Sequence, residues 1–213
     1  MNNKSTELVF ILDRSGSMSG MESDTIGGFN SMIEKQKRLE GDCLVTTILF
    51  NSAMDMIHDR CALNEIKPMT NKDYCVGGST ALLDALGSAI HHISQIHKYA
   101  RPADIPEVTT FVIMTDGMEN ASRKYSYEQV KQMIEQSRER GWEFLFLAAD
   151  IDAVETAGHI GINPERAVDY LKDHVGTELA FQAIDKTVGA MRRGCGVKAT
   201  WSKSIADDFK KRR

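Results

Sequence analysis

The chain has 213 residues, with 42% hydrophobic and 26% charged side chains, which are the proportions of an ordinary soluble globular protein. This length is enough for one α/β domain with a sizeable core. The formal net charge of -4 gives no indication that the chain as a whole binds nucleic acid or a membrane surface.

No apolar stretch approaches the length of a membrane span, and the polar start of the chain, residues 1–7, is not followed by the apolar core of a secretory signal. The four cysteines are widely spaced and form no C-x-x-C pair; they are Cys43, Cys61, Cys75 and Cys195. Reduced thiols are therefore favoured over a disulfide framework or a zinc site. We expect a cytoplasmic protein with no membrane partner.

The first part of the chain predicts two strands, a helix and a hairpin. Residues 8–12 are apolar throughout, which is typical of a strand buried on both faces of its sheet. Apolar residues at helical spacing predict a helix over 22–39. Residues 43–50 predict a second strand, and a turn signal then separates it from 54–60, which we expect to be an antiparallel partner at the sheet edge.

A long loop and a second strand–helix alternation follow. Residues 61–79 lack clear periodicity and predict mostly loop. Helical spacing predicts a helix over 80–99, and 109–114 predicts another buried strand. The next helix is expected over 127–140.

The remaining elements are shorter. Ser126 is a good N-cap for the helix expected over 127–140, and Gln129 completes a capping box with it. Residues 142–148 predict a buried strand, and a short helix is expected after Asp152. The pattern then predicts a last strand over 167–171.

The C-terminal part combines a helix with a basic segment. A helix is predicted over 177–191. Residues 192–213 then hold eight Lys or Arg against two Asp, so this segment carries +6 and the rest of the chain -10. Because the segment also lacks strong periodicity, we expect one domain over 5–191 and a flexible basic tail over 192–213.

Strands that alternate with helices of these lengths predict an α/β fold, a three-layer doubly wound (Rossmann-like) sheet that is mostly parallel, with one antiparallel edge strand. In such sheets, ligands bind beyond the carboxyl ends of the strands, where the strand order reverses.

Three short polar segments stand out against this pattern. Asp13-Arg14-Ser15-Gly16-Ser17 follows the first strand, Gly78-Ser79-Thr80 precedes the second long helix, and Thr115-Asp116-Gly117 follows the strand at 109–114. Two carboxylates and three hydroxyls at one end of a sheet are hard oxygen donors that suit a hard divalent cation such as Mg2+.

The pattern D-x-S-x-S, a later Thr and a later T-D-G resembles the metal-ion-dependent adhesion site of von Willebrand factor type A domains. Asp13, Ser15, Ser17, Thr80 and Asp116 match the five family positions in order. The resemblance covers roughly residues 5–190 and implies the type A domain fold, a doubly wound sheet of the kind predicted above. Residues 141–147 and 158–162 further resemble a bacterial branch of small stand-alone type A proteins.

The resemblance implies a role for each site residue. Ser15, Ser17 and Thr80 would bind the ion directly, while Asp13 and Asp116 would act largely through bound waters. A first shell of neutral hydroxyls leaves the ion electrophilic, and the family uses it to capture an Asp or Glu from a partner protein. We expect Mg2+, with Mn2+ or Ca2+ as alternatives.

Each of these residues has a plainer interpretation when it is taken singly. Asp13, Ser15 and Thr80 could simply cap the helices that follow them, but the full set favours the metal site. Arg14 fills a free position of the motif and is expected to face solvent. Asp150 and Asp152 also follow a strand; a loop turn and a helix cap are favoured there over a place in the crevice.

Three functions remain open. We expect a binding module rather than an enzyme, with a protein partner and not nucleic acid. The alternative is a Mg2+-dependent phosphohydrolase, although no Walker loop or D-x-D-x-T pattern is present. A third possibility is an assembly subunit that acts with an ATPase or a modification system.

Overall fold

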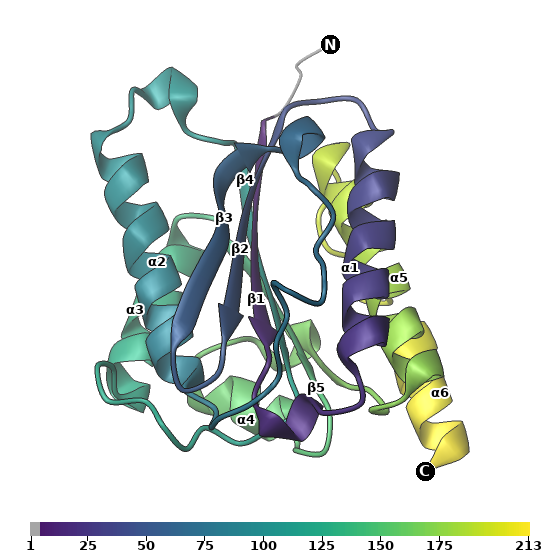
Figure 1. Cartoon of the computed structure of the whole chain (residues 1–213). Coiled ribbons are helices and arrows are strands. Elements are labelled where there is room, and N and C mark those ends of the chain that lie inside the picture. Colours follow the sequence, from purple (N-terminus) through teal and green to yellow (C-terminus); the bar gives the residue numbers. More distant parts are fainter. Residues whose placement is uncertain (1–4) are drawn as a thin grey trace.

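Six strands form one sheet at the centre of the molecule, in the order β3-β2-β1-β4-β5-β6 (Figure 1). The structure is a computed structural model and describes residues 5–213, so residues 1–4 of the polar start lie outside it. Neighbouring strands are parallel except for β3, which runs antiparallel to β2 at the edge. The strands are β1 (Thr6–Asp13), β2 (Cys43–Phe50), β3 (Met54–Ala62), β4 (Val108–Thr115), β5 (Glu143–Ala148) and β6 (Ala167–Asp169).

Helices cover both faces of this sheet, so the predicted three-layer α/β fold with an antiparallel edge strand is confirmed. In Figure 1, α2 and α3 lie on one side of the sheet and α1, α5 and α6 on the other. None of the helices in the described part is both long and apolar enough to cross a membrane. The helices are α1 (Glu22–Lys37), α2 (Leu82–Tyr99), α3 (Tyr127–Glu139), α4 (Ala153–His159), α5 (His174–Arg192) and α6 (Lys203–Arg212).

The apolar run of strand β1 is continuous because helices cover both faces of the sheet at this strand. Successive side chains of a strand point to opposite faces of the sheet. Leu8 and Phe10 therefore join the buried cluster that includes α1 and α5, while Val9 and Ile11 join the cluster that includes α2 and α3. Because β1 is central and covered on both faces, each position of the run is fully buried.

Local sequence signals place most element boundaries well. The strand predicted over 43–50 coincides with β2, and α3 begins at Tyr127 with the predicted capping box. Ser126 accepts a hydrogen bond from the amide of Gln129, and the Gln129 side chain accepts one from the amide of Ser126. The second long helix, predicted from residue 80, instead begins at Leu82.

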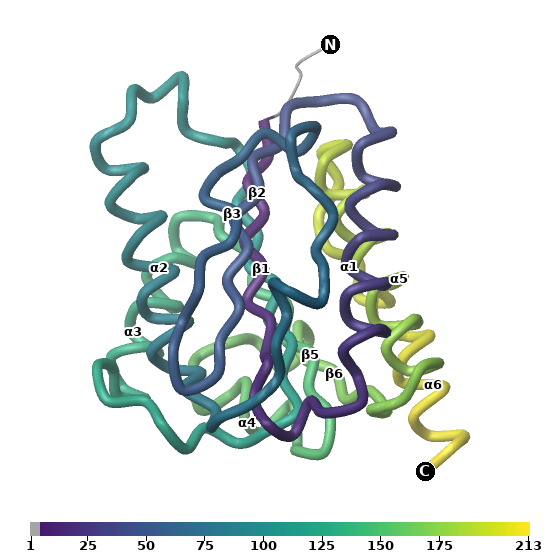
Figure 2. The backbone as a smooth tube through the Cα atoms, in the orientation of Figure 1, coloured from purple at the N-terminus to yellow at the C-terminus, as the bar shows by residue number. Residues whose placement is uncertain are grey.

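The segment between β3 and α2 is mostly loop, as predicted, although β3 itself continues to Ala62. Figure 2 shows this loop running along the sheet beside α1. The side-chain amide of Asn30 donates to the carbonyl of Met69 (2.9 Å), and the amide of Met69 donates back to Asn30 (2.8 Å). Tyr74 is buried at the end of the loop that approaches the carboxyl end of β1.

The expectation of a flexible basic tail over 192–213 is wrong. Residues Lys203–Arg212 form α6, and Trp201 and Ile205 are buried in the cluster shared with α1 and α5. The indole N–H of Trp201 donates to the carbonyl of Glu165 (2.8 Å). Two apolar anchors among basic residues were too few to register as a helical period, yet they dock the segment on the sheet.

Candidate metal centre

The topology brings the first and third polar segments to one place. Strands β1 and β4 are parallel neighbours, with Leu12 opposite Met114, so Asp13 and Thr115 end the two strands at the same edge. After β1 the chain builds outward to β2 and β3, and after β4 it builds the other way to β5 and β6. The gap between β1 and β4 is therefore the point at which strand order reverses, where ligands bind in doubly wound sheets.

Asp13 is almost fully buried, and both of its carboxylate oxygens accept hydrogen bonds from the protein. Oδ1 accepts from the amide of Ser15 (2.7 Å), and Oδ2 accepts from the hydroxyl of Thr115 (2.6 Å). Burial raises the pKa of Asp13 above its ordinary value; these hydrogen bonds oppose the rise, and the nearby charge of Asp116 adds to it. Asp13 thus ties β1 to β4 at the site.

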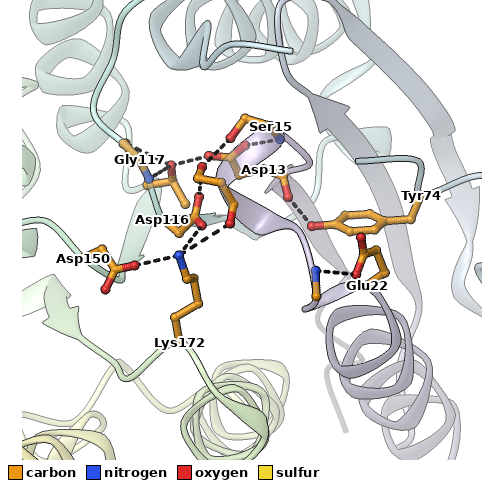
Figure 3. A network of polar contacts seen from close by, with 11 residues as sticks. Asp13, Ser15, Glu22, Tyr74, Asp116, Gly117, Asp150 and Lys172 are labelled. Atoms are coloured by element: carbon orange, nitrogen blue, oxygen red, sulfur yellow. Dashed lines mark hydrogen bonds and ion pairs between the residues drawn. The ribbon is translucent and has the colours of Figure 1, made fainter. Parts of the chain in front are cut away.

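The hydroxyls of Ser15 and Ser17 face each other at 3.0 Å, and Ser17 donates to Asp116 Oδ1 (2.6 Å). A single turn of 3-10 helix over Gly16–Met18 turns the chain so that both hydroxyls point to the same side. Residues 99 positions apart in the chain therefore form one polar cluster (Figure 3).

Thr80 reaches the same cluster from the loop before α2. A Cβ added to Gly117 would stand 3.1 Å from the Thr80 hydroxyl and 3.4 Å from that of Ser17, so both hydroxyl oxygens lie beside Gly117. Thr80 is buried, and its amide donates to the side-chain oxygen of Asn120 (2.9 Å). The absence of a side chain at Gly117 keeps this space open.

Backbone hydrogen bonds join the two loops that carry the hydroxyls. The amide of Gly16 donates to the carbonyl of Gly78 (2.9 Å), and that of Gly77 donates to the carbonyl of Arg14 (2.9 Å). Gly78 has a φ of +79°, and a Cβ there would lie 2.8 Å from the Ser52 hydroxyl. Glycine is therefore required at this position by both conformation and space.

The second carboxylate, Asp116, is only half satisfied. Its Oδ1 accepts from Ser17, whereas Oδ2 is buried and accepts no hydrogen bond. The ammonium of Lys172 lies 3.3 Å from Oδ2 and forms an ion pair with it. This ion pair offsets part of the cost of burying the Asp116 charge, because an unpaired buried charge is costly.

Lys172 is a site residue that the sequence analysis missed. Its ammonium also lies 2.7 Å from Asp150 Oδ2, toward which it points in Figure 3. The carbonyl of Ser17 is 3.4 Å from the same ammonium. The pKa of Lys172 is raised, first by the hydrogen bond to Asp150 and then by Asp116, although its own burial works against this. No local pattern marks a single Lys before a helix, so only the folded chain identifies it.

The two aspartates that follow β5, Asp150 and Asp152, have different roles in the structure. Asp152 caps α4 by accepting from the amide of Glu155 (2.8 Å), as the favoured interpretation predicts. Asp150 is exposed and lines the site edge through Lys172. The expectation that Arg14 faces solvent is wrong: its side chain is only 12% exposed and is paired with Asp55.

The donor set fits a hard divalent ion. Within residues 5–213, no group of three or more His, Cys, Asp or Glu side chains is arranged to hold a metal. The site instead offers the hydroxyls of Ser15, Ser17 and Thr80 together with the carboxylate of Asp116, all of them oxygen donors. Tyr74 closes the far side, where its hydroxyl donates to the carbonyl of Asp13.

Comparison with solved structures finds the same fold in proteins of distant sequence. A von Willebrand factor type A protein from Catenulispora acidiphila is 13% identical, with a TM-score of 0.57 over 88% of this chain and 43% of that chain. The pilus adhesin SpaC from Lactobacillus rhamnosus GG is 11% identical, with a TM-score of 0.67 over 90% of this chain and 31% of that chain.

A third similar structure is proximal thread matrix protein 1 from the mussel byssus, described with a zinc-occupied metal-ion-dependent adhesion site. It is 12% identical, with a TM-score of 0.56 over 87% of this chain and 46% of that chain. No protein-family model and no curated protein sequence matches the chain. This chain spans less than half the length of each of the three structures. At these identities the likeness concerns the fold, which is that of a von Willebrand factor type A-like domain.

Proposed function

We propose that this protein is a divalent-metal-dependent binding module. In this proposal Ser15, Ser17 and Thr80 hold a Mg2+ ion, Asp13 and Asp116 supply the balancing negative charge, and the ion captures an Asp or Glu side chain of a protein partner. Mn2+ or Ca2+ are the alternative ions. The observation that carries the proposal is the run of contacts from the Ser15 hydroxyl through Ser17 to Asp116, with the Thr80 hydroxyl beside the adjacent Gly117 and with Asp116 Oδ2 buried and accepting no hydrogen bond.

The two carboxylates support different roles in this proposal. Both oxygens of Asp13 already accept hydrogen bonds from the protein, so Asp13 is suited to act on the ion through bound water rather than by direct contact. Asp116 has one oxygen that lacks such a bond and is the better placed of the two to face the ion. Neutral hydroxyls leave most of the positive charge of the ion uncompensated, so an outside carboxylate would be attracted to it.

We also propose that the protein is a small bacterial type A protein that works in the cytoplasm within a complex, alongside an ATPase or a modification-system subunit. The cysteines support a reducing compartment, because all four, within the described residues, are unpaired and Cys75 and Cys195 are exposed. The likeness to a pilus adhesin favours a place outside the cell, but at 11% identity it concerns the fold alone.

Thermal unfolding tests the metal site directly. A ligand that binds only the native state adds about 2.7 kcal/mol of stability at a concentration one hundred times its Kd. We expect Mg2+ or Mn2+ to raise the unfolding midpoint of the wild type over that in EDTA, and to leave Ser17→Ala unmoved. Ser94→Ala, at the far end of α2, is the matched control and should respond like the wild type. A wild-type midpoint that no metal shifts would refute the proposal.

We further propose that the site is not catalytic. Among residues 5–213, the polar contacts of the Asp13 and Asp116 side chains come from hydroxyls, a backbone amide and Lys172, and no histidine that could act as a general base is among them. Turnover of p-nitrophenyl phosphate in Mg2+ that disappears in Asp13→Asn would overturn this view and favour the phosphohydrolase alternative.

A further inference from the structure

The ammonium of Lys172 occupies the edge of the candidate metal centre. It lies 3.3 Å from Asp116 Oδ2, 2.7 Å from Asp150 Oδ2 and 3.4 Å from the carbonyl of Ser17. Two of these partners belong to the proposed ion site, and the third stands just outside it (Figure 3). Within the described residues, Lys172 is the basic side chain that is paired with Asp116.

This ammonium balances the Asp116 carboxylate, which has no other counterion among residues 5–213. The side chain of Asp116 is fully buried, and its charge is close enough to Asp13, a second carboxylate, to help raise the pKa of that carboxyl. Lys172 is 27% exposed and reaches this pair from the surface. A positive charge in this place stabilises two carboxylates that a divalent ion would also stabilise.

The residues that flank Lys172 are anchored to α5 and α6. Asp173, the next residue, caps α5 by accepting from the amide of Gly176 (2.8 Å). A Cβ on Gly176 would lie 2.0 Å from the carbonyl oxygen of Leu171, which shows how closely this segment folds onto the helix. Arg212 of α6 binds the other side of Asp173 (2.5 Å).

We propose that Lys172 is a built-in cation that competes with the divalent metal for Asp116. This inference rests on the proposed function, because it concerns the same site. Metal and ammonium repel each other, so metal binding requires the ammonium to leave Asp116 and remain with Asp150, whose exposed carboxylate is already its shorter contact. Lys172 therefore lowers the affinity of the site for the metal.

Isothermal titration with Mn2+ and with Mg2+ tests the competition. Lys172→Met removes the charge and keeps most of the side-chain volume, and we expect it to bind metal about tenfold more tightly than the wild type. Lys172→Arg keeps the charge and should bind about as weakly as the wild type. Lys203→Met makes the same change in net charge at an exposed position on α6 and should leave the affinity unchanged.

A second measurement uses the wild type alone and does not depend on any variant folding. The 15N resonance of the Lys172 ammonium is followed by NMR while diamagnetic Mg2+ is added. We expect it to shift as Lys172 leaves Asp116, with the same midpoint as metal binding, while the resonance of Lys203 stays in place.

The outcomes separate this inference from the proposed function. If the wild type and Lys172→Met bind metal with equal affinity, or the Lys172 resonance does not move on saturation, the competition is refuted and the metal site stands. If neither protein binds any divalent ion, the proposed function fails and the inference fails with it. Tight binding by Lys172→Met with weak binding by the wild type supports both.

Discussion

At the scale of single residues, the two carboxylates of the site differ in what surrounds them. Both carboxylate oxygens of Asp13 accept hydrogen bonds, one from the Ser15 amide and one from the Thr115 hydroxyl. Asp116 Oδ2, in contrast, accepts no hydrogen bond and is paired with the ammonium of Lys172. Burial raises the pKa of Asp13, so keeping it charged in the absence of a cation opposes folding. A cation bound next to Asp13 would offset this cost.

Asp13→Asn should show this in a stability measurement. The substitution keeps the shape of the side chain and removes a buried negative charge, so we expect its free energy of unfolding in EDTA at pH 7 to be at least that of the wild type. In excess Mg2+ the order should reverse, because only the wild type gains binding energy. Urea unfolding of both proteins in the two buffers measures it. A large loss for Asp13→Asn in EDTA would instead indicate a purely structural role.

Gly117 is the residue whose missing side chain keeps the centre open. In Gly117→Ala the new methyl would meet the hydroxyls of Thr80 and Ser17 at 3.1 and 3.4 Å. Hydroxyls can rotate away, so we expect a loss of about 1 kcal/mol or less in metal-free stability. Metal affinity should fall about tenfold or more, a change of about 1.4 kcal/mol, by titration calorimetry.

Gly158 in α4 provides the matched control for that substitution. A Cβ there would meet nothing within 4 Å, so Gly158→Ala should raise helix stability by about 0.5–1 kcal/mol and leave metal affinity unchanged. If Gly117→Ala bound metal as tightly as Gly158→Ala does, the ion would not lie between Thr80 and Ser17.

At the scale of elements, the loop after β4 is fixed to α2 rather than loose. Asp84, in the first turn of α2, accepts from the backbone amides of Arg123, Lys124 and Tyr125 at 2.8–2.9 Å. Glu119 accepts from the amide of Leu83 (2.9 Å). These contacts hold the loop that carries Asp116 and Gly117 to the same helix that follows Thr80, so the second and third polar segments are fixed relative to one helix.

The C-terminal helix is the second element whose role can be measured. Trp201 is buried and its indole donates to Glu165, so Trp201→Ala should lower the free energy of unfolding by about 3–5 kcal/mol. Lys203→Ala, exposed on α6, should change it by no more than about 0.5 kcal/mol. Equal unfolding midpoints in urea for the two variants would mean that the segment after α5 is not docked.

At the scale of the whole molecule, several carboxylates link stability to pH. Hydrogen bonds lower the pKa of Asp84, Asp73 and Asp173 below the ordinary value of 3.8. Groups of this kind contribute stability above that value and lose it as the pH falls through their lowered pKa. Asp13 has the opposite sign: its pKa is raised, so its contribution is present below 3.8 and is lost as the pH rises through its folded value.

We therefore expect the free energy of unfolding to fall as the pH is lowered below about 4, with a slope of up to about 1.4 kcal/mol per pH unit for each of the three carboxylates. Urea titrations from pH 2.5 to 7 in EDTA measure the slope. Asp84→Asn should flatten it, and Asp207→Asn, at an exposed position on α6, serves as the comparison. An identical slope in Asp84→Asn and the wild type would exclude Asp84 as a source.

The sequence by itself determined that the fold has three layers, that its sheet is mostly parallel with one antiparallel edge strand, and which segments meet at the site. Continuous apolar runs predict central strands such as β1 and β4, and the capping box of Ser126 and Gln129 predicts where α3 begins, because these signals depend only on near neighbours. The five residues predicted for the site lie at the ends of such elements, so their places follow once the strands do.

Only the tertiary structure decided which distant residues complete the site. Lys172 stands 155 positions from Ser17 and reaches it because β6 and α5 return the chain to the carboxyl edge of the sheet. Trp201 and Ile205 likewise turn a basic segment into a docked helix by meeting a core built from other elements. Such contacts leave no periodic trace in the sequence, because their free energy comes from groups that are adjacent only after folding.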